Sequence, residues 1–280
     1  MISHVVVAGA GTMGAGIAQV FAQAGMRVSL VDVSPKQLEN AIQKARDSLQ
    51  RLAQKGSIAQ DAIGPTLDRI TTLNSFENLS ADLFIEAVPE NIDLKIDLFR
   101  KANAVFGPTT LFASNTSGLS ISKMASALGS SRDLIGLHFF NPVPVMKLLE
   151  VVKGENTSER AIETARWIAE KLKKETIVVR DSPGFATSRL GICIAFEAMR
   201  MLETNVASAE DIDKAMVFGY GHPIGPLKLT DLVGLDVRLA IGEHLFQTLG
   251  QAQFQPPEIL RKLVKEGALG QKSGRGFHSW

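Results

Sequence analysis

Apolar and polar positions divide the chain into two unlike parts. Up to residue 183, short apolar runs alternate with longer segments in which apolar residues recur at helical spacing. Such runs predict buried strands, and the spaced segments predict helices with one apolar face. Alternation of the two predicts a doubly wound α/β domain over residues 1–183. No convincing strand pattern follows, so residues 184–280 are predicted to form an all-helical domain.

The predicted elements follow from these patterns and from their end signals. Ser34 and Gln37, for example, form a capping box before a segment with one apolar face. Strands are predicted over residues 3–8, 27–31, 69–73, 82–87, 110–113, 134–137, 148–152 and 176–179. Helices are predicted over residues 13–24, 34–54, 91–106, 158–174, 185–205, 208–218, 227–233, 235–249 and 257–266.

Three spaced glycines follow the first predicted strand. Gly9, Gly11 and Gly14 form the pattern G-x-G-x-x-G. The first glycine allows a tight turn, the second lets the backbone approach a pyrophosphate, and the third lets the helix pack on the strand. The helix that begins beside Thr12 and Met13 offers unpaired N–H groups and a positive dipole end to an anion. The pattern predicts a Rossmann-like domain that binds a dinucleotide.

The second predicted strand ends at an acidic residue, Asp32. A carboxylate about 20 residues beyond the glycines is suited to hold the ribose hydroxyl pair of a dinucleotide. The alternative is a turn or helix-capping role, because Ser34 and Pro35 follow it. Asp32 would repel a 2′-phosphate, and the next residues supply no arginine to bind one. NAD is therefore predicted as the cofactor in preference to NADP.

Composition excludes several classes of partner. Among 280 residues, 30 Lys and Arg balance 29 Asp and Glu, so no net field recruits nucleic acid or an anionic membrane. No apolar run approaches the roughly 20 residues needed to span a bilayer, and the N-terminal run lacks a basic flank. The single cysteine, Cys193, favours a reducing compartment. We expect a cytoplasmic protein, unless a transit peptide was cleaved, and no metal site.

Hydride transfer to or from an alcohol also needs a group that exchanges the hydroxyl proton near neutral pH, and histidine suits that task. Of five histidines, only His138 is predicted at the carboxyl end of a strand beside other candidate site residues. The alternative is a packed or capping histidine. Glu150 interrupts an otherwise apolar strand, where an acid needs a partner or must be neutral. Spacing alone does not separate it from Glu86 or Glu90 as the partner of His138.

Two further segments are predicted at the ligand-binding edge of the sheet. Ala87, Val88 and Glu90 follow a buried strand, and the carboxyl ends of strands are where ligands bind in doubly wound folds. Asn115 and Ser117 belong to a polar cluster after the next strand. Such side chains either cap the following helix or point into the cofactor crevice.

Six motifs together resemble the L-3-hydroxyacyl-CoA dehydrogenase family, most of all its short bacterial members, the 3-hydroxybutyryl-CoA dehydrogenases. They lie in order along nearly the whole chain and are far more specific together than the glycines alone. The motifs are GAGTMGAGIA at 9–18, SNTS at 114–117, HFFNPV at 138–143, KLLEV at 147–151, DSPGF at 181–185 and KSGRGF at 272–277. The resemblance implies NAD-dependent, reversible oxidation of a short L-3-hydroxyacyl-CoA.

The resemblance also implies roles for single residues. His138 and Glu150 would form a general acid/base pair, with His138 acting on the 3-hydroxyl group. Ser117 would hydrogen-bond the substrate oxygen near the nicotinamide, and Asn141 would help to hold cofactor or substrate.

Four more positions are assigned by the same resemblance. Glu90, Lys95 and Lys272 match cofactor contacts, and Lys55 matches a basic position near coenzyme A. One position departs from the family pattern. Ser188 stands where the family usually has an asparagine that belongs to the active site. A serine is shorter, so it would use a water molecule or suit a different substrate geometry.

Two alternatives to this function stay open. One is a dehydrogenase of a hydroxy acid without coenzyme A, such as a sugar acid or carnitine, which would act on free acids and not on acyl-CoA. The other is a catalytically silent NAD-binding structural protein, which would bind NAD without turnover.

The helix predicted over residues 185–205 is apolar on most sides, which predicts a homodimer through the C-terminal helices.

Overall fold

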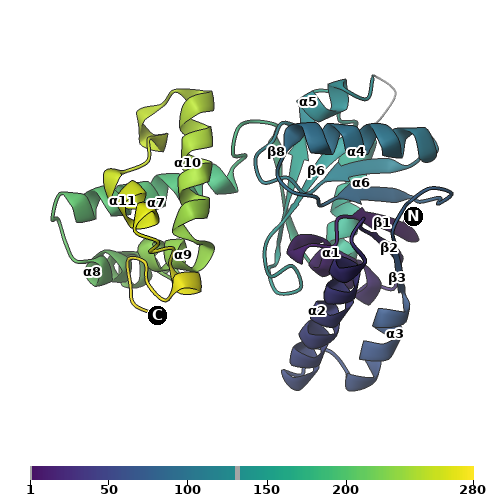
Figure 1. Ribbon diagram of the computed structural model, residues 1–280, viewed down its shortest axis with the longest axis horizontal. Helices are drawn as coiled ribbons and strands as arrows, with labels where there is room; N and C mark the ends of the chain where they lie inside the picture. Colours follow the sequence, from purple (N-terminus) through teal and green to yellow (C-terminus); the bar gives the residue numbers. More distant parts are fainter. Residues whose placement is uncertain (1, 130–132) are drawn as a thin grey trace. The chain divides into compact units, whose positions relative to one another are not determined.

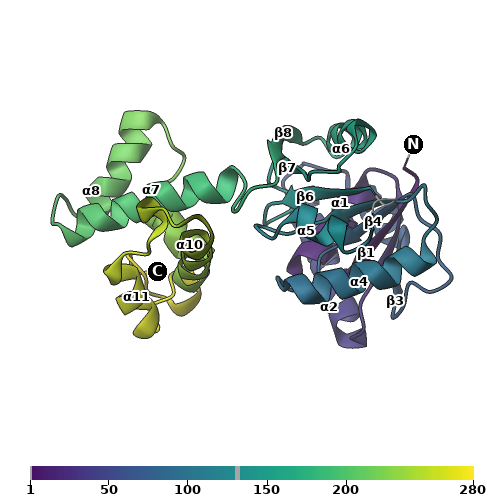
Figure 2. The same ribbon diagram turned by 90° about the horizontal axis from the view of Figure 1, so that it is seen from above.

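The chain folds into two units of different secondary structure. The structure, a computed structural model, describes residues 2–129 and 133–280 (Figure 1). Met1–Ser182 form an α/β unit, and Pro183–Trp280 form a helical unit. Figure 2 shows the strands within the first unit and helices throughout the second. The predicted fold class, a Rossmann-like sheet followed by a helical domain, is confirmed.

The described strands form one eight-stranded sheet in the order β3-β2-β1-β4-β5-β6-β7-β8. Their bounds are β1 His4–Ala8, β2 Arg27–Val31, β3 Ile70–Leu73, β4 Leu83–Glu86, β5 Leu111–Ser114, β6 Leu134–Phe139, β7 Leu148–Lys153 and β8 Glu175–Arg180. Strands β6 and β7 pair antiparallel, and the other described neighbours pair parallel. Every residue of β4, β5 and β6 is buried, as expected for strands covered by helices on both faces.

Helices connect the strands of the first unit. They are α1 Thr12–Gln23, α2 Pro35–Gln54, α3 Ile63–Asp68, α4 Ile92–Val105, α5 Ile121–Ser126 and α6 Glu159–Lys171, with a short 3₁₀ helix at Gln60–Ala62. Polar side chains fix where several of them begin. Ser34, Asn91, Ser120 and Ser158 each accept a hydrogen bond from a backbone N–H of the first helical turn. Each such cap stabilises its helix by about 1 kcal/mol.

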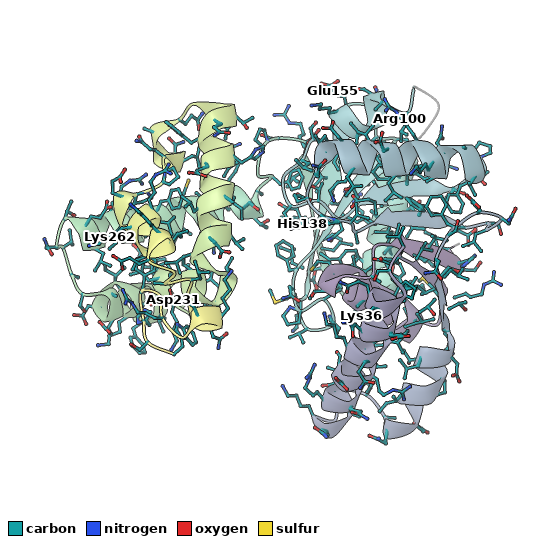
Figure 3. All side chains as sticks on the ribbon, in the orientation of Figure 1. Lys36, Arg100, His138, Glu155, Asp231 and Lys262 are labelled. Carbon is teal, nitrogen blue, oxygen red and sulfur yellow. The ribbon has the colours of Figure 1, made fainter. Side chains whose placement is uncertain are left out.

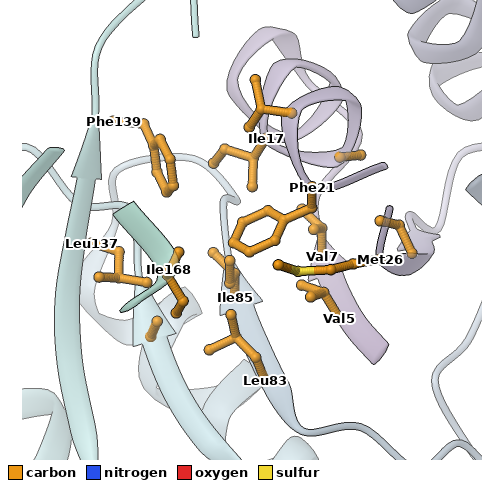
Figure 4. Close-up of a cluster of buried hydrophobic side chains, with 14 of the residues drawn as sticks. Val5, Val7, Ile17, Phe21, Met26, Leu83, Ile85, Leu137, Phe139 and Ile168 are labelled. Atoms are coloured by element: carbon orange, nitrogen blue, oxygen red, sulfur yellow. The ribbon is translucent and has the colours of Figure 1, made fainter. Parts of the chain in front are cut away.

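The two faces of the sheet have different side chains, because successive residues of a strand point to opposite sides. Figure 4 shows one face, where Ile85 of β4 and Phe139 of β6 pack with Phe21 of α1 and Ile168 of α6. On the other face Phe84 packs against Phe112 and against Phe99 of α4, with ring centroids 5.3 and 6.0 Å apart. The strand residues that alternate with the first set therefore face α4 and α5.

The second unit is built around a long helix. Its elements are α7 Thr187–Glu203, α8 Ala209–Lys214, a π-helical turn Ala215–Gly219, α9 Pro226–Val233, α10 Leu235–Leu249, α11 Glu258–Lys265, and 3₁₀ helices Ala252–Phe254 and Gln271–Ser273. Fully buried side chains of α7, α9 and α10, among them Phe196, Leu227 and Leu245, form its core with Phe254. The helix predicted over residues 208–218 thus ends at Lys214, where the wider π turn begins.

The C-terminal residues are held on the helical unit by a buried carboxylate. Asp231 is 1% exposed, and its oxygens accept hydrogen bonds from the backbone N–H groups of Phe277 and His278 at 2.8 Å and from Trp280 Nε1 at 3.0 Å. His278 Nε2 lies 2.8 Å from a carboxylate oxygen of Asp213. Within residues 2–129 and 133–280, no helix combines the length and apolar character that a membrane crossing requires.

Candidate active site

The glycine turn at the start of α1 is sterically restricted to glycine at two of its three positions. Gly9 has a φ of +106°, and a Cβ there would lie 2.6 Å from the carbonyl oxygen of Ala87. A Cβ on Gly14 would lie 1.7 Å from the carbonyl oxygen of Gly9. At Gly11, a Cβ would meet nothing within 4 Å in the described part of the chain. Gly11 therefore leaves open space beside the helix end, where a phosphate group fits.

The groups around this turn suit a dinucleotide. Among the described residues, no side chain caps the N-terminus of α1, which leaves Thr12 and Met13 at its first positions to meet an anion. Lys44 Nζ lies 3.5 Å from Thr12 Oγ1 and adds a cation there. Asp32 accepts hydrogen bonds from the backbone N–H of Ala10 at 2.8 Å and of Ser34 at 2.9 Å. Its carboxylate is thereby fixed beside the glycine turn, as ribose recognition requires.

A histidine and a glutamate face each other across the antiparallel pair of strands. His138 of β6 and Glu150 of β7 are directly opposite in register. His138 Nδ1 lies 2.8 Å from Glu150 Oε2, and the two side chains are 7% and 0% exposed (His138 is labelled in Figure 3). A buried carboxylate at Nδ1 orients the imidazole ring and stabilises its protonated form. The reversal of β7 creates this pair, because it brings residue 150 back beside residue 138.

Neighbouring segments fix the end of β6. Asn115 Oδ1 accepts a hydrogen bond of 2.9 Å from the backbone N–H of Phe139 and so ties the β5–α5 loop to the residue after His138. Lys174 Nζ donates to the carbonyl oxygens of Val143 and Met146 at 2.7 and 2.6 Å. Burial lowers the pKa of Lys174. These bonds hold the loop between β6 and β7, which also contains the exposed Asn141.

The polar residues of β4 to β7 share one face of the sheet. Glu86 pairs in register with Ser114, and Ser114 pairs with Gly136. His138 lies two residues beyond Gly136 on β6, so its side chain points to the same side, and so does that of its partner Glu150. The pair therefore lies on the α4 side of the sheet, near the strand ends where doubly wound folds bind ligands.

Comparison with known proteins identifies the family. The family model for the NAD-binding domain of 3-hydroxyacyl-CoA dehydrogenase matches residues 4–182, and the model for the C-terminal domain of the same family matches residues 184–280. The chain belongs to the 3-hydroxyacyl-CoA dehydrogenase family. It is an oxidoreductase of that family, and NAD is its cofactor.

Individual relatives match over nearly their whole length. A probable 3-hydroxybutyryl-CoA dehydrogenase of Bacillus subtilis is 41% identical over 280 residues, which are 100% of this chain and 98% of the relative. The mitochondrial hydroxyacyl-coenzyme A dehydrogenase of Sus scrofa is 39% identical and covers 100% of this chain and 92% of its own. The crystal structure of (S)-3-hydroxybutyryl-CoA dehydrogenase from Ralstonia eutropha has a TM-score of 0.95 at 38% identity, with 100% and 99% of the two chains covered.

Three further predicted site residues belong to other elements of the structure. Ser188 is the second residue of α7, and Lys272 lies in the last 3₁₀ helix, so both belong to the helical unit. Lys272 Nζ binds both carboxylate oxygens of Asp236 at 2.6 and 2.7 Å. Lys55 is the exposed residue that follows the end of α2 and caps it.

Sequence reasoning missed the burial of Lys95 and its ion pair with Glu86. Lys95 is 1% exposed and binds Glu86 at 2.6 Å and Glu90 at 3.2 Å. Burial raises the pKa of Glu86, although the ammonium of Lys95 acts against this rise. The one available sign was that Glu86 interrupts an apolar strand, just as Glu150 does.

Proposed function

We propose that this enzyme catalyses the reversible, NAD-dependent oxidation of a short-chain L-3-hydroxyacyl-CoA, with 3-hydroxybutyryl-CoA as the preferred class, to the 3-oxoacyl-CoA. The observation that carries the proposal is the buried Glu150 carboxylate 2.8 Å from His138 Nδ1, on a sheet whose first turn suits a dinucleotide. The names of the bacterial relatives support the acyl-CoA substrate.

The reaction divides between the cofactor and the protein. Bound NAD would supply the acceptor for the hydride that leaves C3 of the substrate. His138 takes the proton of the 3-hydroxyl group at Nε2, and Glu150 stabilises the resulting imidazolium through Nδ1. In reduction, His138 returns that proton to the carbonyl oxygen. The Ser117 hydroxyl donates a hydrogen bond to the same oxygen, and Asn141 helps to hold the reacting groups in place.

The remaining candidate residues are proposed to bind the two ligands. Gly9, Gly11, Thr12, Met13 and Gly14 surround the pyrophosphate, and Asp32 binds the ribose. The other residues proposed to contact the cofactor are Ala87, Val88, Glu90, Lys95, Asn115, Ser117, Asn141 and Lys272. Ser117, His138, Asn141 and Ser188 face the acyl part of the substrate, and Lys55 lies near coenzyme A.

The test follows NADH and NADPH separately with acetoacetyl-CoA, longer 3-oxoacyl-CoAs and free 3-oxo acids. We expect turnover of acetoacetyl-CoA with NADH. His138→Ala should lower kcat by about 10²- to 10⁴-fold, the usual contribution of a general acid or base, and leave the Kd for NADH within about twofold. His244→Ala, at an exposed position of α10, is the matched control. Most turnover retained in His138→Ala contradicts the proposal.

Other outcomes identify the alternatives. Turnover of free acids with none of acyl-CoA indicates a dehydrogenase of hydroxy acids without coenzyme A. Tight NADH binding without turnover of any candidate indicates a silent binding protein.

We further propose that two copies associate through the helical unit. Helices α7, α9 and α10 pack against one another and carry exposed apolar side chains, of which Leu190 is 64%, Leu232 45% and Val237 41% exposed. Arg238 follows Val237, is only 7% exposed, and its Nε has no hydrogen-bond partner among the described residues. Burial lowers the pKa of Arg238 to about 10. A second copy would cover the apolar side chains and supply an acceptor.

Light scattering after size exclusion tests the association. We expect a dimer at micromolar concentration and a monomer for Leu190→Glu. Gln247→Glu, at an exposed polar position of α10, brings the same added charge and should leave the dimer intact. A monomeric wild-type protein contradicts this proposal and leaves the catalytic one unaffected.

A further inference from the structure

An aromatic side chain lies against the imidazole of His138. The ring centroids of His138 and Phe140 are 4.3 Å apart, and the two ring planes are tilted by 46°. The phenylalanine pairs described in the same unit have centroids 5.2 to 6.3 Å apart. The rings of His138 and Phe140 are therefore closer together than those of these core pairs.

The geometry of β6 brings the two rings together. His138 belongs to this strand and Phe140 is the first residue after it, so the two side chains share a face. Phe139, between them, points to the opposite face. It is 1% exposed and packs with Phe21, with ring centroids 6.3 Å apart. The buried side chain of Phe139 thus anchors the backbone from which both rings project.

Hydrogen bonds fix the backbone on both sides of Phe140. Before it, the N–H of Phe139 donates to Asn115 Oδ1 at 2.9 Å. After it, the carbonyl oxygen of Val143 accepts a hydrogen bond of 2.7 Å from Lys174 Nζ, and the side chain of Val143 is 2% exposed. Because both flanking segments are held, the half-buried ring of Phe140 has little freedom to move away from the imidazole.

A contact with the imidazole ring adds to what Glu150 provides. Glu150 Oε2 lies 2.8 Å from His138 Nδ1, and a contact at one ring atom still allows the ring to tilt about that atom. A second ring packed against the imidazole restricts this tilt, and Phe140 supplies that ring. Nε2 then keeps a fixed direction, as proton transfer to or from a substrate requires.

We propose that Phe140 is a positioning residue, which holds the His138 imidazole at the angle at which Nε2 meets the substrate hydroxyl group. The inference rests on the proposed function, because that function gives His138 its role. The aromatic ring is needed for this task, since a flat side chain covers more of another ring than a branched aliphatic one does.

The decisive variant is Phe140→Ala, which removes the ring. In the oxidation of L-3-hydroxybutyryl-CoA with NAD, kcat should fall about 10- to 100-fold, as for a small misplacement of a reacting group. Phe140→Tyr keeps the ring and should retain kcat within about twofold of the wild type.

Phe76→Ala is the matched control. Phe76 is also half-buried and packs against another ring, that of Phe84, with centroids 5.5 Å apart. Its removal should lower Tm to a similar extent as Phe140→Ala and leave kcat unchanged. Phe140→Leu, which keeps apolar bulk without a flat ring, serves in the same comparison if Phe140→Ala does not fold.

Several results would overturn the proposal. A kcat in Phe140→Ala within about twofold of the wild type means that the ring is not needed. An equal loss of kcat in Phe140→Tyr and Phe140→Ala means that the ring is not what matters. A raised KM for the acyl-CoA with kcat unchanged means that Phe140 binds the substrate and does not act through His138.

Motion of the imidazole tests the same inference without turnover. Relaxation measurements on isotope-labelled histidine give the order parameter of the ring, with the His138 signal assigned by its loss in His138→Ala. The order parameter should fall in Phe140→Ala and keep its wild-type value in Phe140→Tyr and Phe76→Ala. An unchanged value in Phe140→Ala contradicts the inference. A wild-type enzyme that fails to oxidise L-3-hydroxybutyryl-CoA contradicts the proposed function, and the ring motion still decides whether Phe140 holds His138.

Discussion

Glu150→Gln removes one negative charge beside His138 and keeps a hydrogen-bond acceptor of the same size. The two side chains are buried, with Nδ1 and Oε2 2.8 Å apart. Charge centres about 4 Å apart interact by about 4 kcal/mol at an effective dielectric constant near 20. The glutamine oxygen retains a neutral hydrogen bond of about 1 kcal/mol. The glutamine therefore stabilises the imidazolium of His138 by about 3 kcal/mol less than the glutamate does. Because the imidazolium forms during oxidation, this loss raises the barrier, and kcat should fall about a hundredfold.

Steady-state oxidation of L-3-hydroxybutyryl-CoA with NAD, the direction in which the imidazolium forms, gives kcat, and NADH fluorescence gives the Kd for NADH. We expect the loss in kcat with a Kd within about twofold of the wild type, because Glu150 is proposed to stabilise the imidazolium and not to bind the cofactor. Glu155→Gln, in the exposed turn after β7 and labelled in Figure 3, makes the same chemical change and should have no effect. A kcat within twofold of the wild type, or an equal loss in NADH affinity, would refute this reasoning.

Two further predictions concern the glycine turn and acid stability. Gly14→Ala places a Cβ 1.7 Å from the Gly9 carbonyl oxygen, so it should lower Tm and abolish NADH binding. A Cβ on Gly11 meets nothing within 4 Å in the described chain, so Gly11→Ala should leave Tm unchanged and only weaken NADH binding. Both are read from thermal melts and fluorescence titration. Burial raises the pKa of Asp82, but the hydrogen bonds that its carboxylate accepts at the start of β1 outweigh this and hold the pKa below its usual 3.8. Asp82→Asn should therefore lower Tm at neutral pH, and this difference should shrink as the pH falls below 3.8; a constant difference excludes the linkage.

Local patterns predicted most of the secondary structure. The helix expected over residues 235–249 is α10, Leu235–Leu249, and the capping box at Ser34 marks the start of α2 at Pro35. The short helices α3 and α5 were not predicted, because six residues are too few to establish a helical period. The glycine turn was recognisable because glycines at fixed spacing carry a steric requirement.

The pairing of strands could not be predicted in the same way. Strands buried on both faces have no alternation that distinguishes parallel from antiparallel neighbours. Spacing alone therefore left Glu150, Glu86 and Glu90 open as partners of His138. The family resemblance assigned Glu150, and the register of β6 and β7 places Glu150 directly opposite His138. The burial of Lys95 could not be predicted either, because a lysine in a helix is usually solvated. Its burial depends on the carboxylate of Glu86, at the end of β4.

The antiparallel strand β7 also limits how this gene can change by insertion or deletion. Its apolar residues, such as Leu149 and Val151, pack in the core with Phe21, and these contacts fix the register. Loss of one codon between Leu148 and Glu150 would exchange the two faces of the strand. The carboxylate would then enter the apolar layer, and a hydrophobic side chain would face His138. Insertions and deletions within the strand should therefore be eliminated, because they damage the apolar core and the His138–Glu150 pair at the same time.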